Sequence, residues 1–231
     1  MAINIVSRSG DPFTTRQEAG QLLADHLKIF KDKKPVVLGI PRGGLVIADY
    51  IARSVNIDFD MVLSHKLGAP WNPELAIGAI CEGGQLFINK EIATRCGADE
   101  TYIKQEKNRQ LQEISRRVRH YRQILPKLPL ENRTVIVTDD GVATGASMQA
   151  AIWAVRQENP LHIITALPVA PEDSLTILSK DVDETICLKM PPYFEALSQF
   201  YLIFDQVEDD QVLEILTQQC QRRERNETRI H

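Results

Sequence analysis

The chain has 231 residues, of which 43% are apolar and 25% charged, and its formal net charge at pH 7 is −4. This length is enough for one α/β core with an appendage, and the composition is ordinary for a globular protein. The negative net charge and a pI of about 5.8 argue against a dedicated nucleic-acid binder or a membrane-surface protein.

The sequence carries no targeting or metal-cluster signal. No apolar run approaches the 18 residues of a membrane span, and the N-terminus lacks the apolar core of a signal peptide. The four cysteines and five histidines are scattered, with neither a C-x-x-C pair nor a zinc-like spacing. They are Cys81, Cys96, Cys187 and Cys220, and His26, His65, His120, His162 and His231. We therefore expect a soluble, cytoplasmic protein with reduced thiols and no membrane partner.

Periodic patterns predict strands that alternate with helices along most of the chain. Apolar residues spaced by three and four indicate helices, and apolar β-branched runs indicate strands. In chain order, the predicted elements are a helix at 15–30, a strand at 35–40, a helix at 43–55, a strand at 58–65, a Gly/Pro-rich loop at 67–73, a hairpin formed by 76–81 and 85–89, a long helix at 99–125, a strand at 133–138, a helix at 145–159, a strand at 161–169, a helix at 171–180, a strand at 183–188 and a helix at 209–221.

This alternation predicts an α/β fold with a mostly parallel, twisted sheet and helices on both faces. We expect a single domain over residues 1–231. Residues 68–128 are predicted to form an insertion between two core strands, carrying a loop, the hairpin and the long helix. In such sheets ligands bind beyond the carboxyl ends of the strands, so polar residues at those ends are the first candidates for a site.

Two adjacent acids, Asp139 and Asp140, follow the predicted strand at 133–138 and precede a turn of small residues at 141–147. This order predicts a buried strand that ends in carboxylates, followed by a loop whose backbone N–H groups point at an anion. The carboxylates suit ribose hydroxyls or a hydrated Mg²⁺, so the motif predicts a phosphoribose site. The alternative is an ordinary strand–turn–helix corner in which the acids complement a helix dipole. The chain has no G-x-G-x-x-G, and Ala146 stands where a Walker loop needs lysine.

The motif resembles the phosphoribosyl diphosphate (PRPP) signature of type I phosphoribosyltransferases. The resemblance implies that Asp139 and Asp140 bind the ribose 2′- and 3′-hydroxyls and, through those hydroxyls or water, the cofactor Mg²⁺. It further implies that residues 143–147 cradle the 5′-phosphate. The PRPP-binding residues carried over from this motif are Asp139, Asp140, Gly141, Val142, Ala143, Thr144, Gly145, Ala146 and Ser147.

A second motif, Pro41-Arg42-Gly43-Gly44, lies between a predicted strand and helix. Its glycines let the backbone approach an anion, and Arg42 supplies a permanent cation with a bidentate fork. It resembles the pyrophosphate-binding loop of the same family. The resemblance implies a catalytic role for Arg42 and a cis non-prolyl peptide between Gly39 and Arg42.

The family's flexible, substrate-covering loop begins at a place comparable to residues 64–74. Lys66 is therefore a candidate catalytic phosphate contact, together with Arg42, Asp139 and Asp140. The alternative is a structured loop in which Lys66 and Glu74 are merely solvated.

Residues 190–206, which we call the hood segment, contain five of the chain's twelve Phe and Tyr residues. Type I enzymes carry a small hood that covers the acceptor base. By position, Tyr193 or Phe194 would stack on the acceptor, and Asp205 would contact the acceptor or a metal. The aromatic residues serve equally well as the core of the hood.

Residues 104–133 hold nine Lys or Arg against three Glu. A solvated helix face is the commonest explanation of such a stretch. Steering of an acidic substrate and a homo-oligomer contact are the alternatives.

The order of motifs resembles that of stand-alone bacterial phosphoribosyltransferase-domain proteins, with F-x-x-R-x-x-A-G at 13–20 and K-x-G-x-P-x-N-P-E at 66–74. The resemblance implies Mg²⁺-dependent transfer of 5-phosphoribose from PRPP to a nitrogen acceptor, a nucleobase, with release of pyrophosphate. The alternative is a regulatory protein that senses PRPP without transfer, and the retained Arg42-Gly43-Gly44 favours the enzyme. A sugar-phosphate hydrolase would need a nucleophile constellation that the sequence lacks.

Overall fold

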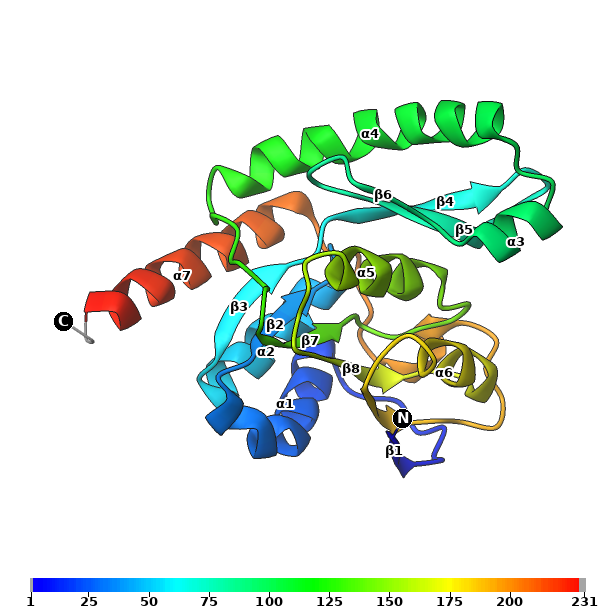
Figure 1. Cartoon of the computed structure of the whole chain (residues 1–231). Helices are drawn as coiled ribbons and strands as arrows, with labels where there is room; N and C mark the ends of the chain where they lie inside the picture. The colour runs from blue at the N-terminus through cyan, green and yellow to red at the C-terminus, as the bar shows by residue number, and fades with distance from the viewer. Residues whose placement is uncertain (1, 229–231) are drawn as a thin grey trace.

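The computed structural model describes residues 2–228, apart from the side chains of residues 113, 116, 117 and 227. Its centre is a six-stranded parallel sheet in the order β1-β9-β8-β7-β2-β3 (Figure 1). The strands are β1 (Ala2–Ser7), β2 (Val36–Gly39), β3 (Asp58–Met61), β7 (Thr134–Thr138), β8 (His162–Val169) and β9 (Glu184–Lys189).

Helices cover both faces of this sheet, as the sequence predicts. One face packs against α1 (Arg16–Leu27), α2 (Gly43–Val55) and α7 (Asp209–Thr228), and the other against α5 (Ala146–Arg156) and α6 (Glu172–Leu178). Successive residues of a strand point to opposite faces, so Val37 joins the first core and Val36 and Leu38 the second. All three side chains are buried, which explains the continuous apolar runs of these strands.

A second lobe lies beside the main sheet, and in this lobe α4 packs across the lobe's own strands (Figure 1). It consists of the antiparallel strands β4, β5 and β6 and the helices α3 and α4. Their bounds are β4 (Ser64–Ala69), β5 (Asn72–Cys81), β6 (Leu86–Ile88), α3 (Lys90–Arg95) and α4 (Glu100–Arg122). Small residues of β5, Ala76 and Ala79, pack on Ala146, Ala150 and Trp153 of α5.

The structure corrects the prediction of a loop at 67–73. Most of that stretch belongs to β4 and β5, which pair directly and leave only Pro70 and Trp71 as the turn. Leu67 and Ile77 are fully buried beneath α4 and α3. Glycine and proline are uncommon in strands, so the local sequence does not predict these two. They are stabilised by pairing with each other rather than by the preferences of their residues.

Other local differences are smaller. The first helix ends at Leu27 and continues as the 3₁₀ helix η1 (Lys28–Lys33), and the predicted strand at 58–65 is divided between β3 and β4. The predictions include neither α3 nor β1, an edge strand that pairs only with β9 and leaves Ile3 and Val6 exposed. The remaining predicted helices and strands of the main sheet are confirmed to within a few residues, except that the last helix, predicted at 209–221, continues to Thr228.

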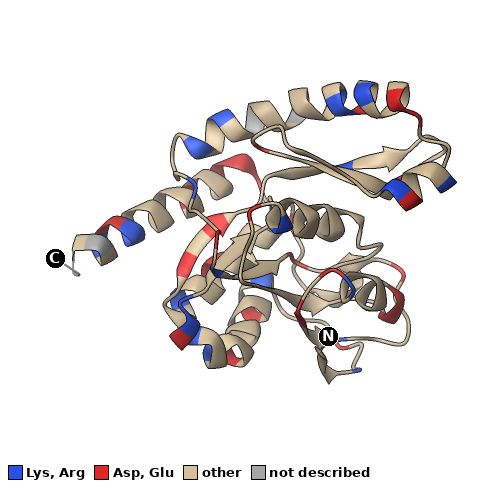
Figure 2. Ribbon diagram, in the orientation of Figure 1, with Lys and Arg blue, Asp and Glu red and all other residues tan. Residues whose placement is uncertain are grey.

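Lys and Arg positions, blue in Figure 2, occur along α4 and also on other helices, where they alternate with Asp and Glu positions. Arg122 makes ion pairs inside the protein, Lys127 makes partly exposed ion pairs with Glu82 and Glu158, and Arg133 pairs with Asp58. The side chains of Arg116 and Arg117 lie outside the described part of the chain. Part of the local excess of positive charge is therefore used in ion pairs within the protein.

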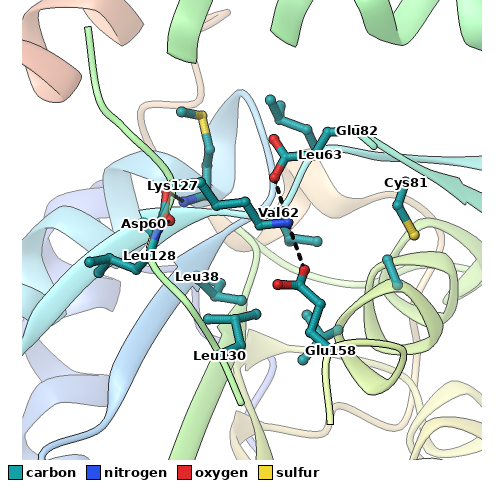
Figure 3. Close-up of a pocket in the computed structure, with 13 residues that line it drawn as sticks. Leu38, Asp60, Val62, Leu63, Cys81, Glu82, Lys127, Leu128, Leu130 and Glu158 are labelled. Atoms are coloured by element: carbon teal, nitrogen blue, oxygen red, sulfur yellow. Dashed lines mark hydrogen bonds and ion pairs between the residues drawn. The ribbon is translucent and has the colours of Figure 1, made fainter. Parts of the chain in front are cut away.

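Buried ion pairs join the second lobe to the main sheet. Arg122 donates to Asp60 of β3 (Nη1–Oδ1 2.5 Å) and to Glu82 (Nε–Oε2 2.7 Å). Lys127 then bridges Glu82 and Glu158 at 2.8 and 2.9 Å, inside a small pocket under β3 and α5 (Figure 3). The cluster contains more carboxylates than cations, so each cation has two acidic partners.

The pKa values of these acids follow from that arrangement. Burial raises the pKa of Asp60 even though Arg122 opposes the shift. For Glu82, burial also acts to raise the pKa, but Arg122 and Lys127 together bring it below its usual range. Removing a cation would leave buried carboxylates without compensation, which is costly.

No helix within residues 2–228 is both long and apolar enough to span a bilayer. Among the side chains that the structure describes, no group of three or more from His, Cys, Asp or Glu is arranged to hold a metal ion. His231 and residues 1, 229 and 230 of the predicted domain lie outside the described residues.

Replacing Arg122 by methionine should lower the free energy of unfolding by about 3–5 kcal/mol, because Asp60 and Glu82 lose their shared partner. Urea denaturation measures this change. Arg119→Met is the matched control on the same helix, because the Arg119 side chain is exposed and its Nε donates to the Ser115 carbonyl of its own helix. It should change stability by less than about 0.5 kcal/mol. Equal effects of the two substitutions would contradict the role of the buried cluster.

Candidate functional site

The two acids of the first motif stand at the carboxyl edge of the main sheet, directly after β7. Asp139 is partly exposed, and its Oδ1 accepts a hydrogen bond from the Asp140 backbone N–H at 2.8 Å. Asp140 is 9% exposed, and its Oδ2 accepts from Arg16 Nε at 2.7 Å. The pair thus combines one residue that keeps some exposure with one that Arg16 holds from within.

Burial and the neighbouring charge of Asp140 raise the pKa of Asp139 well above its usual range. Burial also raises the pKa of Asp140, against the opposing effect of the Arg16 guanidinium. Two carboxylates this close resist ionising together. A cation or hydroxyl donors at this edge would favour the ionised pair, which is the chemistry expected of a sugar-diol or hydrated-metal site.

The small-residue loop after the acids begins α5. Gly145 adopts a left-handed conformation (φ 82°) immediately before Ala146, the first residue of the helix. Backbone N–H groups in the first turn of a helix have no partner within it, and the helix dipole favours an anion there. Ala143, Thr144 and Ser147 are exposed at this end. The loop can therefore hold a phosphate at the edge that carries the acids.

Val142, also among the predicted PRPP-binding residues, has a different surrounding. Its side chain is buried, and its N–H donates to the Val169 carbonyl at 2.9 Å. Gly141 is buried as well, with Leu197 so close that a Cβ would come within 2.2 Å of it. These two residues connect the loop to β8 and the hood segment, and they leave the exposed part of the loop to contact ligands.

The second motif lies against the acids because β2 and β7 are neighbours in the sheet. The Ile40 N–H donates to the Thr138 carbonyl at 3.0 Å. A Cβ on Gly43 would lie 2.0 Å from Asp140 Oδ2, and a Cβ on Gly44 would lie 2.8 Å from the Thr138 carbonyl oxygen. The peptide bond between Pro41 and Arg42 is cis, as expected for this stretch.

Arg42 reaches away from the acids, toward the start of α7. Its Nη1 lies 3.9 Å from Glu208 Oε2 and 3.7 Å from Asp209 Oδ1, and its side chain is one-third exposed. Both carboxylates are largely exposed, so these contacts are weak, about 0–1 kcal/mol each. The side chain can therefore exchange them for another anion at small cost.

Lys66 projects from β4 and pairs with Glu74 of β5 at 2.9 Å. Both residues line a cleft of about 340 Å³ between the second lobe and the main sheet. Pro41 of the second motif and Ser147 of the first line the same cleft. The structure thus brings Lys66 to the two motifs, but from a strand pair rather than from a free loop.

The three predicted acceptor residues have separate surroundings. Tyr193 is 83% exposed, whereas Phe194 packs on Phe200 with ring centroids 4.9 Å apart. Asp205 lines a cavity of about 180 Å³ together with Arg16. Phe194 therefore belongs to the packing of the hood segment.

Two residues at the site were not predicted to act there. Arg16 appears in the sequence only as part of the F-x-x-R-x-x-A-G pattern, yet it binds Asp140. The Tyr201 hydroxyl donates to the Asp140 carbonyl at 2.5 Å. Burial and the charge of Asp140 raise the pKa of Tyr201 far above its usual range, so Tyr201 remains a neutral donor. The pattern around Arg16 was the available signal, but the contact joins residues 124 positions apart.

Residues 14–202 match the family model described as phosphoribosyl transferase domain. The chain belongs to this family. The crystal structure of TT1426 from Thermus thermophilus is similar, with 42% sequence identity, a TM-score of 0.85, and coverage of 90% of this chain and 98% of that one.

Two curated relatives come from Mycobacterium tuberculosis strains CDC 1551 / Oshkosh and H37Rv, and they carry the names "Putative phosphoribosyl transferase MT0597" and "Putative phosphoribosyl transferase Rv0571c". Each is 36% identical over 204 residues, which is 88% of this chain and 46% of the relative. The chain therefore spans about half the length of the curated relatives it matches. The family and the fold are thus shown by sequence and by structure.

Gly44→Ala should lower the free energy of unfolding by about 1–3 kcal/mol, because the new methyl group meets the backbone at Thr138 and Asp139. Urea denaturation is the measurement. Gly10→Ala is the matched control, since a Cβ there has nothing within 4 Å, and it should change stability by less than about 0.5 kcal/mol. If Gly44→Ala is as stable as Gly10→Ala, the two motifs do not pack as closely as described.

Proposed function

We propose that this protein transfers 5-phosphoribose from PRPP to a nitrogen acceptor, a nucleobase, and releases pyrophosphate. The observation that carries the proposal is the meeting of the two motifs at one sheet edge. The loop at 41–44 lies against Asp139 and Asp140, and the start of α5 adjoins the same acids. The residues proposed for a phosphate, a diol and a second anion are therefore neighbours, which supports a ligand with the groups of PRPP.

Each part of PRPP has its own residues in this proposal. The exposed N–H groups and hydroxyls of residues 143–147 hold the 5′-phosphate. Asp139 and Asp140 hold the ribose hydroxyls. The loop at 41–44 binds the pyrophosphate, with Arg42 exchanging its exposed acidic partners for it and Lys66 facing it across the cleft.

The donor chemistry of the edge fits a hydrated Mg²⁺. Two adjacent carboxyl groups with raised pKa values offer oxygen ligands, which Mg²⁺ prefers while keeping several waters. Asp139 and Asp140 would hold the ion through ribose hydroxyls or water. When bound, Mg²⁺ neutralises the charge that develops on the departing pyrophosphate.

The protein residues contribute position and electrostatics rather than a covalent nucleophile. The two motifs hold donor and leaving group in fixed register, and loop N–H groups and Arg42 stabilise the pyrophosphate as it departs. We propose that the strand pair β4–β5, which leads into the insertion at 68–128, covers the cleft and limits access of water. The hood segment at 190–206 covers the acceptor side. Excluding water matters because an oxocarbenium-like ribosyl centre would otherwise be hydrolysed.

Incubation with PRPP, Mg²⁺ and a panel of nucleobases, with pyrophosphate measured, tests the transfer. We expect pyrophosphate release that depends on one base or a few. PRPP binding without release in the presence of any base would favour the alternative, a PRPP-sensing regulatory protein. The same panel identifies the acceptor.

Asp139→Asn combined with Asp140→Asn should weaken PRPP binding at least about 100-fold, because both charged acceptors of the ribose hydroxyls are lost. Isothermal titration calorimetry with Mg²⁺ measures the affinity. Asp25→Asn is the control, since Asp25 is an exposed carboxylate on α1 whose ion pair is with Lys28. It should leave the affinity unchanged. Unaltered binding in the double variant would rule out the acids as the ribose site.

A further inference from the structure

We propose that Arg16 is a positioning residue that holds Asp140 for the sugar hydroxyls of the substrate and ties this acid to residues 204–205. This role rests on the proposed phosphoribose site. The guanidinium makes three contacts at once: Nε to Asp140 Oδ2 at 2.7 Å, Nη1 to the Asp205 carbonyl at 2.9 Å, and its face to the Phe204 ring at 3.9 Å.

These contacts use both the edge and the face of the planar guanidinium. Two hydrogen bonds along the edge and a ring against the face define one orientation, which a lysine ammonium cannot reproduce. The Arg16 side chain is 11% exposed and that of Asp140 is 13% exposed, so water screens the pair little. The contact is therefore stronger than the exposed ion pairs of Arg42.

The start of α1 places Arg16 at this point. Arg16 is the first residue of the helix, and Thr15 caps it by accepting from the Glu18 N–H at 3.3 Å. The Glu18 carboxylate in turn accepts from the N–H of Thr14, the residue before the cap, and so fixes the entry of the chain into the helix. The arginine thus comes from an element outside both PRPP motifs.

Asp140 is confined from its other sides as well. Gly43 lies so close that its Cβ position is 2.0 Å from Asp140 Oδ2, and the Tyr201 hydroxyl binds the Asp140 carbonyl at 2.5 Å. Arg16, Gly43 and Tyr201 together therefore restrict the position of Asp140. A fixed acceptor recognises a hydroxyl better than a mobile one, because less rotamer entropy is lost on binding.

The phosphate half of the site has no contact with Arg16 among the described hydrogen bonds and ion pairs. The residues of the phosphate loop at 143–147 are positioned by α5 and by α6, whose Ser174 hydroxyl donates to the Ala143 carbonyl at 2.5 Å. Loss of the guanidinium should therefore weaken recognition of the sugar and leave recognition of phosphate intact. A purely structural role would weaken both together.

The test compares Arg16→Met with the wild-type protein, measuring the dissociation constants of ribose 5-phosphate and of inorganic phosphate with Mg²⁺ by NMR titration. We expect the variant to bind ribose 5-phosphate about 10-fold more weakly and phosphate within about 2-fold of wild type. Arg16→Lys should lose part of the sugar affinity, because it keeps the charge without the fork. If Arg16→Met does not fold, Arg16→Lys alone provides the comparison with the wild-type protein.

Arg133→Met is the matched control. Arg133 likewise binds one carboxylate and one carbonyl, those of Asp58 and Lys34, but at the opposite end of β7. Both affinities should stay at the wild-type values in this variant.

Parallel loss of both affinities in the Arg16 variants, or unchanged ribose 5-phosphate binding, would overturn the positioning role. If the wild-type protein binds ribose 5-phosphate no more tightly than phosphate, the phosphoribose site itself is wrong, and the role of Arg16 is wrong with it. The two failures are therefore distinguishable.

Discussion

The pairing of β2 with β7 is the constraint on which the site depends. Gly39 lies opposite Thr138 in this parallel ladder, so both strands end at the same level of the sheet. The loop at 41–44 and the acid pair therefore emerge side by side, although about 100 residues separate them in the chain. Glycine at position 44 then lets the two backbones approach to a distance that a side chain would prevent, and glycine at position 43 leaves room for the Asp140 carboxylate.

Two arginines serve this edge in different ways because their surroundings differ. Arg16 is nearly buried and makes short contacts, so it opposes the rise in the pKa of Asp140 that burial causes. Arg42 is one-third exposed and lies beyond 3.5 Å from its acidic partners. One guanidinium is thus part of the architecture, while the other is free to bind a substrate anion under the proposed function.

The second lobe forms a packed wall of the cleft. Its strands rest on α5 through alanines, which allow close approach, and its base is joined to β3 by the buried cluster around Arg122. The position of Lys66 relative to the motifs therefore depends on core packing and ion pairs far from the ligand. This arrangement differs from that of a lysine on an unpaired loop, which would lose conformational entropy when it orders.

The sequence by itself determined the α/β class, most strands and helices of the main sheet, and the two motifs, because these depend on periodicity and on short runs of neighbouring residues. It did not determine the β4–β5 pair, because these strands contain glycines and prolines and are stabilised by pairing with each other. Nor did it determine that Arg16 holds Asp140, or that Phe194 packs on Phe200 rather than standing apart. Contacts between residues distant in the chain are decided by how helices and strands pack, and no local pattern records them.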